Sequence, residues 1–368
     1  MSFQNRLRLA AVASLSLTLT LAAHADSFVQ TNLVSNVSGL AAHTDPNLIN
    51  PWGMSFSGTS PFWTSNQGTG TATLYDGAGT PQALVVTIPG STTGPSGPTG
   101  QVFNGGTGFQ VNGAASRFIF ANLNGTISAW NGSGTTAAVV ATTPGAIYTG
   151  LAISGNTLYA ANNSQGRIDV FNSSFAPTTL AGSFTDPNLP AGFTPYNVQA
   201  IGSTVYVTYA KLGPGGVPMA GGFVDAFNAD GTFSQRIASG GSLFAPWGIT
   251  LAPSTFGAFG GDLLIGNFGS GIIDAFSTTG AFLGVLLGPD GQPLVNSGLW
   301  ALDFRTGGAN VNTNALYLTA GINGEQGGLF AAITPATPEP SSLILAGSGL
   351  AALATILFRR NFTAAQGN

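Results

Sequence analysis

The sequence predicts an all-β protein in which one structural unit is repeated six times around a ring. A glycine-led stretch with an aromatic anchor recurs every 41 to 56 residues, and its anchors are Tyr75, Trp130, Phe171, Phe227, Phe276 and Phe330. Each unit divides into short apolar runs bounded by Gly, Asn and Pro, which are strand signals. No helical periodicity is found between residues 26 and 337. Six radial repeats of this kind describe a six-bladed β-propeller with four-stranded blades.

The elements of each unit follow in a fixed order. The first strands are expected at 52–56, 150–153, 198–201, 247–251 and 300–304. The second strands are expected at 62–65, 118–121, 158–161, 205–209, 263–266 and 316–319. The anchor strand comes third, and a fourth strand leads out, as at 83–88. The insertions at 211–221 and 253–261 are either binding loops or flexible turns, and flexible turns are favoured.

The last unit lacks a fourth strand of its own. The chain supplies a spare strand at 28–34, ahead of the first unit. We expect it to pair with residues 328–333 and to close the ring, because closure removes an open sheet edge. The propeller is therefore predicted to span residues 26–335.

The N-terminus is typical of a secretory signal peptide covering residues 1–25. Arg6 and Arg8 precede an apolar stretch that ends in a small-x-small cleavage site at Ala23 and Ala25. A first transmembrane helix is the alternative, but the apolar run is short. The sequence therefore predicts an exported protein whose mature chain starts at Asp26.

The C-terminus carries a second signal. A linker at 336–340 ends in Pro338, Glu339 and Pro340, and residues 341–358 carry no charge before Arg359 and Arg360. Eighteen helical residues span about 27 Å, close to a bilayer core. We expect a transmembrane helix over 341–360, with residues 361–368 as a cytoplasmic tail because basic flanks resist translocation.

That order of elements resembles the PEP-CTERM sorting signal of Gram-negative bacteria. The resemblance implies an exosortase as partner, which cuts near the Pro-Glu-Pro and releases the protein. The chain is then tethered to the inner membrane before it reaches the cell surface or the extracellular space. A plain C-terminal anchor is the alternative.

Composition excludes several function classes. Residues 26–337 hold five basic and twelve acidic residues, a net charge of −7. An acidic surface with one lysine argues against nucleic acid and anionic membrane surfaces as partners. The chain has no cysteine, and His43 is the single histidine after residue 25, so a multi-histidine zinc site is excluded. No cofactor is expected.

Candidate ligand-binding residues recur at equivalent positions. An asparagine follows the second strand in four units, at Asn66, Asn122, Asn162 and Asn267. These side chains either stabilise turns or form a ring of amides for a sugar. Trp52, Trp247 and Trp300 lead first strands, and they either pack between blades or stack on sugar rings. Asp169, Asp225 and Asp274 lie in anchor strands and either face solvent or cap turns; a Ca²⁺ site of clustered carboxylates is the alternative.

The stretch at 160–171, AANNSQGRIDVF, resembles the core of an NHL repeat. The chain as a whole is similar to a family of uncharacterised PEP-CTERM-associated propeller proteins. The stretches that carry this likeness are DPNLINPWGMSF from Asp45, GPTGQVFNG from Gly97, YNVQAIG from Tyr196, VYVTYAKLG from Val205, APWGITLAP from Ala245, LLIGNFGSGIIDAF from Leu263 and GLWALDF from Gly298. The resemblance implies six blades and export. It does not point to any particular activity. The chain departs from the family at Gly327, where members tend to have histidine.

Two functional hypotheses follow. The leading one is a non-catalytic surface or matrix protein that binds polysaccharide or another protein, or serves as a scaffold. The rival is a metal-dependent hydrolase or lactonase that uses the central channel. Fold alone does not decide between them.

Overall fold

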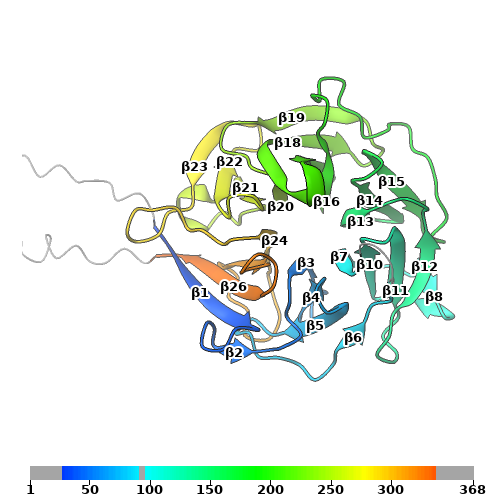
Figure 1. The fold of residues 1–368 in the computed structure, drawn as a ribbon, viewed down its shortest axis with the longest axis horizontal. Helices are drawn as coiled ribbons and strands as arrows, with labels where there is room; N and C mark the ends of the chain where they lie inside the picture. The colour runs from blue at the N-terminus through cyan, green and yellow to red at the C-terminus, as the bar shows by residue number, and fades with distance from the viewer. Residues whose placement is uncertain (1–26, 91–95, 337–368) are drawn as a thin grey trace, which may run out of the picture.

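The computed structural model describes residues 27–90 and 96–336, which form a ring of six radially arranged sheets (Figure 1). Six inner strands line the centre, and each contacts the inner strand of the next sheet. The sixth inner strand contacts the first, so the ring is closed. The predicted six-bladed β-propeller is therefore confirmed.

The blades are built from consecutive strands, ordered here from the centre outward. Blade 1 holds β3 (Pro51–Ser55), β4 (Phe62–Asn66), β5 (Thr71–Tyr75) and β6 (Val86–Thr87). Blade 2 holds β7 (Pro98–Phe103), β10 (Phe118–Asn122), β11 (Thr126–Trp130) and β12 (Ala138–Thr142). Blade 3 holds β13 (Tyr148–Ser154), β14 (Thr157–Asn162) and β15 (Arg167–Asn172).

The second half of the ring follows the same order. Blade 4 holds β16 (Thr194–Ile201), β17 (Thr204–Leu212), β18 (Pro218–Asn228) and β19 (Phe233–Ser239). Blade 5 holds β20 (Pro246–Leu251), β21 (Leu263–Asn267), β22 (Ile273–Phe276) and β23 (Phe282–Val285). Blade 6 holds β24 (Leu299–Phe304), β25 (Leu316–Ala320), β26 (Leu329–Pro335), β1 (Phe28–Ser35) and β2 (His43–Thr44). The small extra elements are the hairpin β8 (Gln110–Val111) and β9 (Ala114–Ala115), and the 3-10 turns η1 (Pro214–Gly216) and η2 (Gly257–Phe259).

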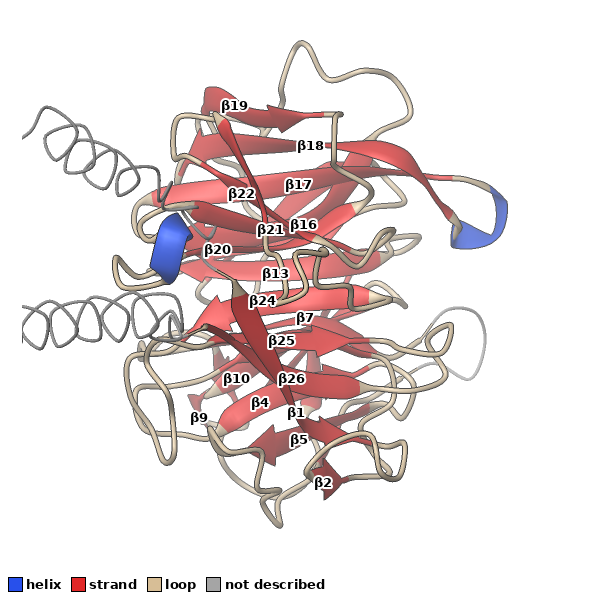
Figure 2. Ribbon diagram, turned by 90° about the vertical axis from the view of Figure 1, so that its left-hand side faces the viewer, coloured by secondary structure: helices blue, strands red, loops and turns tan. Residues whose placement is uncertain are grey.

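Burial decreases from the inner to the outer strands. Strands β3 and β4 are buried along their whole length, whereas β12 and β23 are largely exposed or half-buried. The hydrophobic clusters lie between the faces of adjacent blades; one of them joins Ile119 and Ile127 of blade 2 to Leu151 and Leu158 of blade 3. Stacking of one twisted sheet on the next therefore supplies the core (Figure 2).

The inner strands pack backbone against backbone. A Cβ atom added at Gly53 would lie 2.5 Å from the carbonyl oxygen of Thr99 in the next blade. One added at Gly248 would lie 2.4 Å from the carbonyl oxygen of Trp300. Glycine at the middle of an inner strand is therefore required by the close approach of neighbouring blades.

The N-terminal strand closes the ring as the sequence predicts. Strand β1 pairs antiparallel with β26, with Phe28 opposite Pro335 and Ser35 opposite Leu329. The Ala336 amide donates to the Ser27 carbonyl oxygen at 2.7 Å. Both ends of the described chain therefore leave blade 6 side by side (Figure 1).

Blade 3 differs from the expected four strands. After β15 the Thr178 amide still donates to the Val170 carbonyl oxygen, but no further ladder forms. The chain crosses to blade 4, where the Gly182 amide donates to the Asp230 carbonyl oxygen. The fourth strand is lost because this segment pairs with the neighbouring blade.

The two insertions are ordered by specific contacts. The segment predicted as a turn at 211–221 extends β17 and β18 into a projecting hairpin (Figure 2). In the segment at 253–261, Phe256 is fully buried and packs on Phe28, with ring centroids 5.0 Å apart. The first segment is therefore a projecting β-hairpin, and the second is a turn packed onto the ring.

Among the described residues, no helix is long and apolar enough to cross a membrane. The predicted signal peptide at 1–25 and the predicted helix at 341–360 lie outside the described residues.

Candidate functional site

The central channel has two chemically different mouths. Residues from the later parts of five inner strands, β3, β7, β13, β16 and β24, line one cavity, so these strands run in the same direction through the ring. We call the end where they begin the upper mouth, and the end where they finish the lower mouth. Between the two lies a cavity of about 20 Å³, lined by residues that include Gly53, Asn197 and Trp247. It has room for about one water molecule, so the mouths are separate sites.

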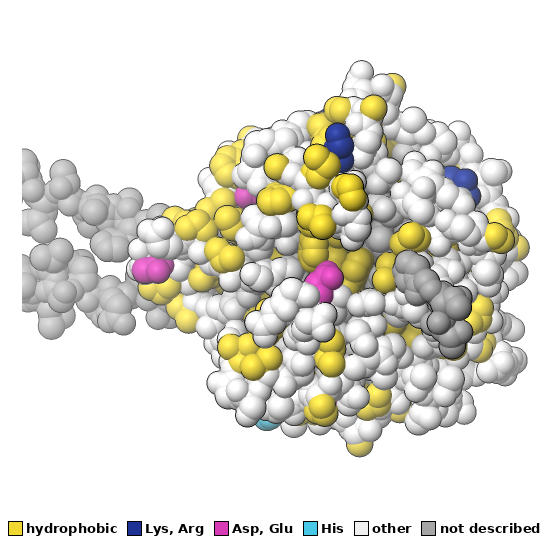
Figure 3. Space-filling view, in the orientation of Figure 1, with side chains coloured by type: hydrophobic (Ala, Val, Ile, Leu, Met, Phe, Trp, Pro, Cys, Tyr) yellow, Lys and Arg dark blue, Asp and Glu magenta, His cyan; other side chains and the backbone are white. Residues whose placement is uncertain are grey.

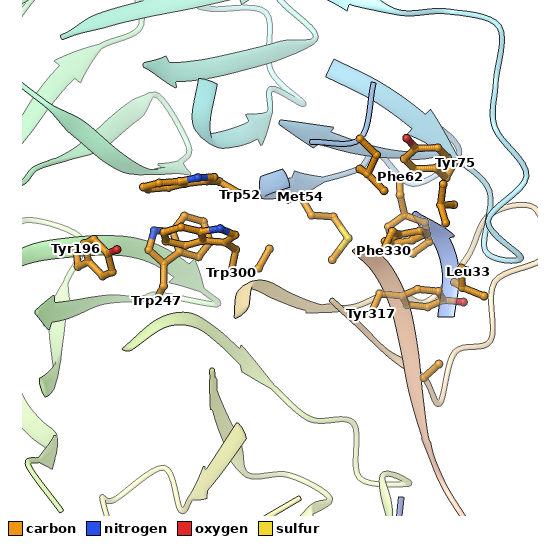
Figure 4. Close-up of a cluster of buried hydrophobic side chains, with 14 of the residues drawn as sticks. Leu33, Trp52, Met54, Phe62, Tyr75, Tyr196, Trp247, Trp300, Tyr317 and Phe330 are labelled. Atoms are coloured by element: carbon orange, nitrogen blue, oxygen red, sulfur yellow. The ribbon is translucent and has the colours of Figure 1, made fainter. Parts of the chain in front are cut away.

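The three predicted tryptophans meet below the upper mouth and close the channel. Trp52 and Trp300 stack with ring centroids 3.6 Å apart, and Trp247 meets Trp300 edge-on at 5.7 Å (Figure 4). Tyr196 and Phe268 extend this cluster. The tryptophan side chains are at most 7% exposed, so they form an aromatic floor.

The indole N–H groups of these tryptophans are not equally satisfied. Nε1 of Trp247 donates to the Thr149 carbonyl oxygen, and Nε1 of Trp300 donates to Oδ1 of Asn50, both at 2.9 Å. Nε1 of Trp52 is buried and has no partner among the described residues. The aromatic floor therefore holds one unused donor.

A carboxylate lies beside the aromatic floor. Glu325, in the β25–β26 loop, is partly buried, and burial raises its pKa. Burial, followed by the nearby charge of Glu325, raises the pKa of Tyr196 well above its usual value. Figure 3 shows this face, with apolar side chains gathered around the central hollow and an acidic group next to it.

The four predicted asparagines end second strands, so they lie on the same side of the ring as the upper mouth. Asn66 Nδ2 donates to Thr73 Oγ1 at 2.9 Å, and Asn267 Oδ1 accepts from the Phe244 amide at 2.9 Å. Asn122 and Asn162 are likewise fully buried and bonded to residues of their own blades. The structure places each asparagine at the last position of its second strand, next to the turn that leads to the third strand, and does not bring the four together.

The anchor-strand aspartates are also held within separate parts of the ring. Asp169 accepts from Asn162 at 2.7 Å, and Asp274 accepts from Asn267 at 3.0 Å. Asp225 pairs with Arg236, which also binds Asp186. Within residues 27–90 and 96–336 there is no group of three His, Cys, Asp or Glu side chains that could hold a metal ion.

The lower mouth contains a polar cavity that the sequence analysis did not identify. It has a volume of about 200 Å³ and is lined by the final residues of the inner strands, among them Ser55, Gln101, Gln199 and Asp303. Oγ of Ser55 and Oε1 of Gln101 are buried without a hydrogen-bond partner among the described residues. Buried oxygen atoms of this kind usually have a partner, so their position in a cavity marks a candidate ligand site.

The charge at the lower mouth comes from Asp303. Its carboxylate accepts the Phe304 amide at 2.8 Å, and no residue of the described ranges forms a salt bridge with it. Burial raises the pKa of Asp303 to about 7, while the Phe304 amide and the charge of Arg305 act in the opposite direction. The Arg305 guanidinium binds the carbonyl oxygens of Ser57 and Ser60 instead.

A larger cavity lies at the outer rim. It has a volume of about 560 Å³ and flanks β15, the outermost strand of blade 3. Its lining is mostly apolar and includes Ile168, Leu180 and Phe184. This cavity lies where the other blades have a fourth strand, and it is remote from the channel.

Comparison with known proteins gives two kinds of match. Residues 336–361 match the PEP-CTERM protein-sorting motif. This motif marks the chain for export and exosortase-dependent sorting, with membrane anchoring through its C-terminal region before processing. The protein is therefore an exported surface protein.

Solved structures share the fold. The soluble aldose sugar dehydrogenase from Escherichia coli superposes with a TM-score of 0.53 at 13% identity, over 84% of this chain and 100% of that chain. A protein of unknown function from Bacteroides thetaiotaomicron gives a TM-score of 0.53 at 12% identity, over 83% and 76% of the two chains. At these identities the likeness extends to the propeller fold alone.

Two viral proteins are much more similar in sequence. The uncharacterized protein R648 of Acanthamoeba polyphaga mimivirus is 34% identical over 321 residues, which cover 82% of this chain and 78% of that protein. The uncharacterized protein L690 of the same virus is 35% identical over 290 residues, which cover 73% and 77%. The chain therefore belongs to the same family as the mimivirus proteins R648 and L690.

Proposed function

We propose that this exported propeller is a non-catalytic binding protein of the cell surface or matrix that recognises polysaccharide at its upper mouth. The observation that carries the proposal is the combination of an aromatic floor with unused polar atoms: Nε1 of Trp52 and the side chain of Glu325. A sugar ring offers an apolar face for an aromatic group and hydroxyl groups for polar atoms. Such a site needs a few convergent polar groups on an apolar surface.

The position of the chain ends also favours the upper mouth as the binding face. Ser27 and Ala336 lie where β1 begins and β26 ends, on the side of the ring opposite the upper mouth. The sorting motif follows directly. While its C-terminal region holds the protein at the membrane, the upper mouth faces away and is open to a ligand. In this proposal the signal peptide ends at Ala25, and processing occurs near residues 338–340.

The predicted asparagines and tryptophans have separate roles in this site. Trp52, Trp247 and Trp300 provide the floor, and Trp52 carries a buried indole N–H without a partner among the described residues. Asn66, Asn122, Asn162 and Asn267 fix the turns that frame the mouth, and they contribute to binding through the shape of those turns.

Titration of the mature protein with purified surface polysaccharides tests the proposal. Glu325→Gln removes the negative charge of the carboxylate and Trp52→Phe removes the indole donor, and we expect each to weaken binding about ten- to hundredfold while the fold is kept. Asp290→Asn, at an exposed turn, is the matched control and should bind as the wild type does. Equal binding by all four proteins would contradict an upper-mouth site.

A metal-dependent hydrolase is the second candidate. Its support is the lower mouth, where Asp303 lies with oxygen-bearing side chains in one cavity. Calcium in protein purified without chelator, together with hydrolytic activity that chelation abolishes, would favour this candidate. Polysaccharide binding by the metal-free protein would favour the first.

A further inference from the structure

The lower mouth is rich in hydrogen-bond acceptors with fixed orientation. Nε2 of Gln101 donates to the Gly53 carbonyl oxygen at 3.0 Å and also to the Trp63 carbonyl oxygen. A flipped amide would turn its oxygen toward these two carbonyl groups, so Oε1 must remain the free atom. Gln101 is 5% exposed, and its Oε1 has no partner in the described part of the chain. Gln101 lines the cavity, so a donor placed there could satisfy this oxygen.

Two further acceptors lie in the same cavity. Ser55 is 9% exposed, and its hydroxyl oxygen is buried without a partner among the described residues. Asp303 has one oxygen occupied by the Phe304 amide, which leaves the other oxygen of the carboxylate free. The cavity thus combines two neutral acceptors with one carboxylate.

The negative charge of the cavity has no counter-ion. Arg305 is the charged group that acts on Asp303, but its guanidinium is bound to two carbonyl oxygens and lies over the rings of Phe56 and Phe62, at 4.8 and 5.0 Å. No salt bridge reaches Asp303 from any described residue. The complementary ligand therefore carries one positive charge and several N–H donors.

The cavity walls define the rest of the ligand. Met54, Val102 and Ile153 line the same space as the polar groups. A cation with an apolar stem can place its methylene groups along such walls and its charged end against the acceptors. The volume of about 200 Å³ is below the range of roughly 300–1,000 Å³ that is typical of drug-sized ligands. It suits a single side-chain-sized group.

We propose that the lower mouth binds a primary ammonium group, carried by a lysine side chain of a partner or by an amino sugar. The three N–H donors of the ammonium bond to Asp303, Gln101 and Ser55, and the stem lies against Met54. A calcium ion is less well suited, because Ca²⁺ takes six to eight oxygen ligands and only one carboxylate reaches this cavity. This site is separate from the polysaccharide site proposed at the upper mouth.

Isothermal titration of the mature protein at pH 8 tests the proposal. The probe is Nα-acetyl-lysine amide, and Nα-acetyl-norleucine amide is the analogue that has the same four-carbon stem and no ammonium group. We expect the lysine probe alone to bind, and Asp303→Asn to lower its affinity about ten- to hundredfold. Asp290→Asn is the matched control. Because protonation removes the charge of Asp303, wild-type binding should also be lost at pH 5.

Further arms identify the source of the amine and separate the two sites. Glucosamine that binds more tightly than the lysine probe would identify an amino sugar, and the reverse would identify a lysine. Glu325→Gln should leave probe binding unchanged, so a failure at the upper mouth does not affect this test. Binding of the norleucine probe, an unchanged affinity in Asp303→Asn, or calcium binding that the lysine probe does not displace would each overturn the proposal.

Discussion

Closure of the ring by the N-terminal strand leads to a quantitative prediction for Phe28. This residue begins β1 and is fully buried, with its ring centroid 5.0 Å from Phe256 and 5.8 Å from Phe259 of blade 5. Truncation of a buried phenylalanine costs about 3–5 kcal/mol of unfolding free energy. We therefore expect Phe28→Ala to lose about 4 kcal/mol, a large part of the ~5–15 kcal/mol that stabilises a typical domain.

The assay is thermal and denaturant unfolding of the mature protein, followed by circular dichroism. From the average unfolding entropy per residue, a loss of about 4 kcal/mol in a domain of this size lowers Tm by about 6 °C. Val29→Ala is the matched control, because Val29 is the next residue of β1 and is 43% exposed. Its effect should stay within about 0.5 kcal/mol. A loss below 1 kcal/mol for Phe28→Ala would refute the view that β1 is an integral strand of blade 6.

Three further predictions concern buried polar groups. Burial gives the Asp303 carboxyl a pKa of about 7, so the folded state binds more protons than the unfolded state between about pH 4 and pH 7. At about 1.4 kcal/mol per pKa unit, Asp303→Asn should therefore add about 4 kcal/mol of stability at pH 8 and none at pH 3.5; equal effects at the two pH values in urea unfolding would contradict a buried carboxylate. Trp300→Phe removes the donor to buried Asn50 and should cost about 1–3 kcal/mol by the same assay; no loss would contradict a role for this bond. Arg236→Met leaves the buried carboxylates of Asp225 and Asp186 without their ion pairs and should cost about 3–5 kcal/mol near neutral pH by the same assay; a loss below 1 kcal/mol would contradict a stabilising role for Arg236.

The sequence predicts the fold well because propeller blades repeat. Glycine-led anchor strands recur at similar spacing, and the strands found at β4, β10, β14, β17, β21 and β25 include the predicted second strands. The need for a closing strand also follows from sequence, since the last unit lacks one. These features are predictable because the chain contains six copies of one unit, and a pattern that is weak in one copy is clear in the others.

The inner strand of blade 2 was missed for a physical reason. Strand β7 carries Thr99 and Gln101, and both are buried polar residues that bond to the backbone of neighbouring blades. Strands are usually recognised in a sequence by apolar residues at alternate positions. A strand that lines a channel with polar residues lacks this pattern and is not recognised. The glycines at the centre of the inner strands were the available signal: Gly100 in β7 occupies the same place as Gly53 in β3.

The candidate sites were predicted less well than the fold. Sequence repetition identifies residues that occur in several blades, such as the asparagines and tryptophans, and these belong largely to the repeated architecture. Asp303 and Glu325 each occur in one blade only, and nothing in the local sequence shows that they reach the channel. Their environment depends on six inner strands brought together by ring closure, which no single repeat contains.

The most direct test of ring closure is an engineered disulfide between the first and last strands. Thr31 lies directly opposite Ala332, and the chain has no cysteine of its own. Opposed residues of antiparallel strands have Cα atoms about 4.5–5.5 Å apart, within the range of a disulfide. If β1 closes the ring, Thr31→Cys with Ala332→Cys oxidises to one intramolecular disulfide in the folded protein, whereas Thr31→Cys with Phe282→Cys, on blade 5, does not. Free thiols in the first variant under oxidising conditions, or the same disulfide yield in both, would contradict closure by β1.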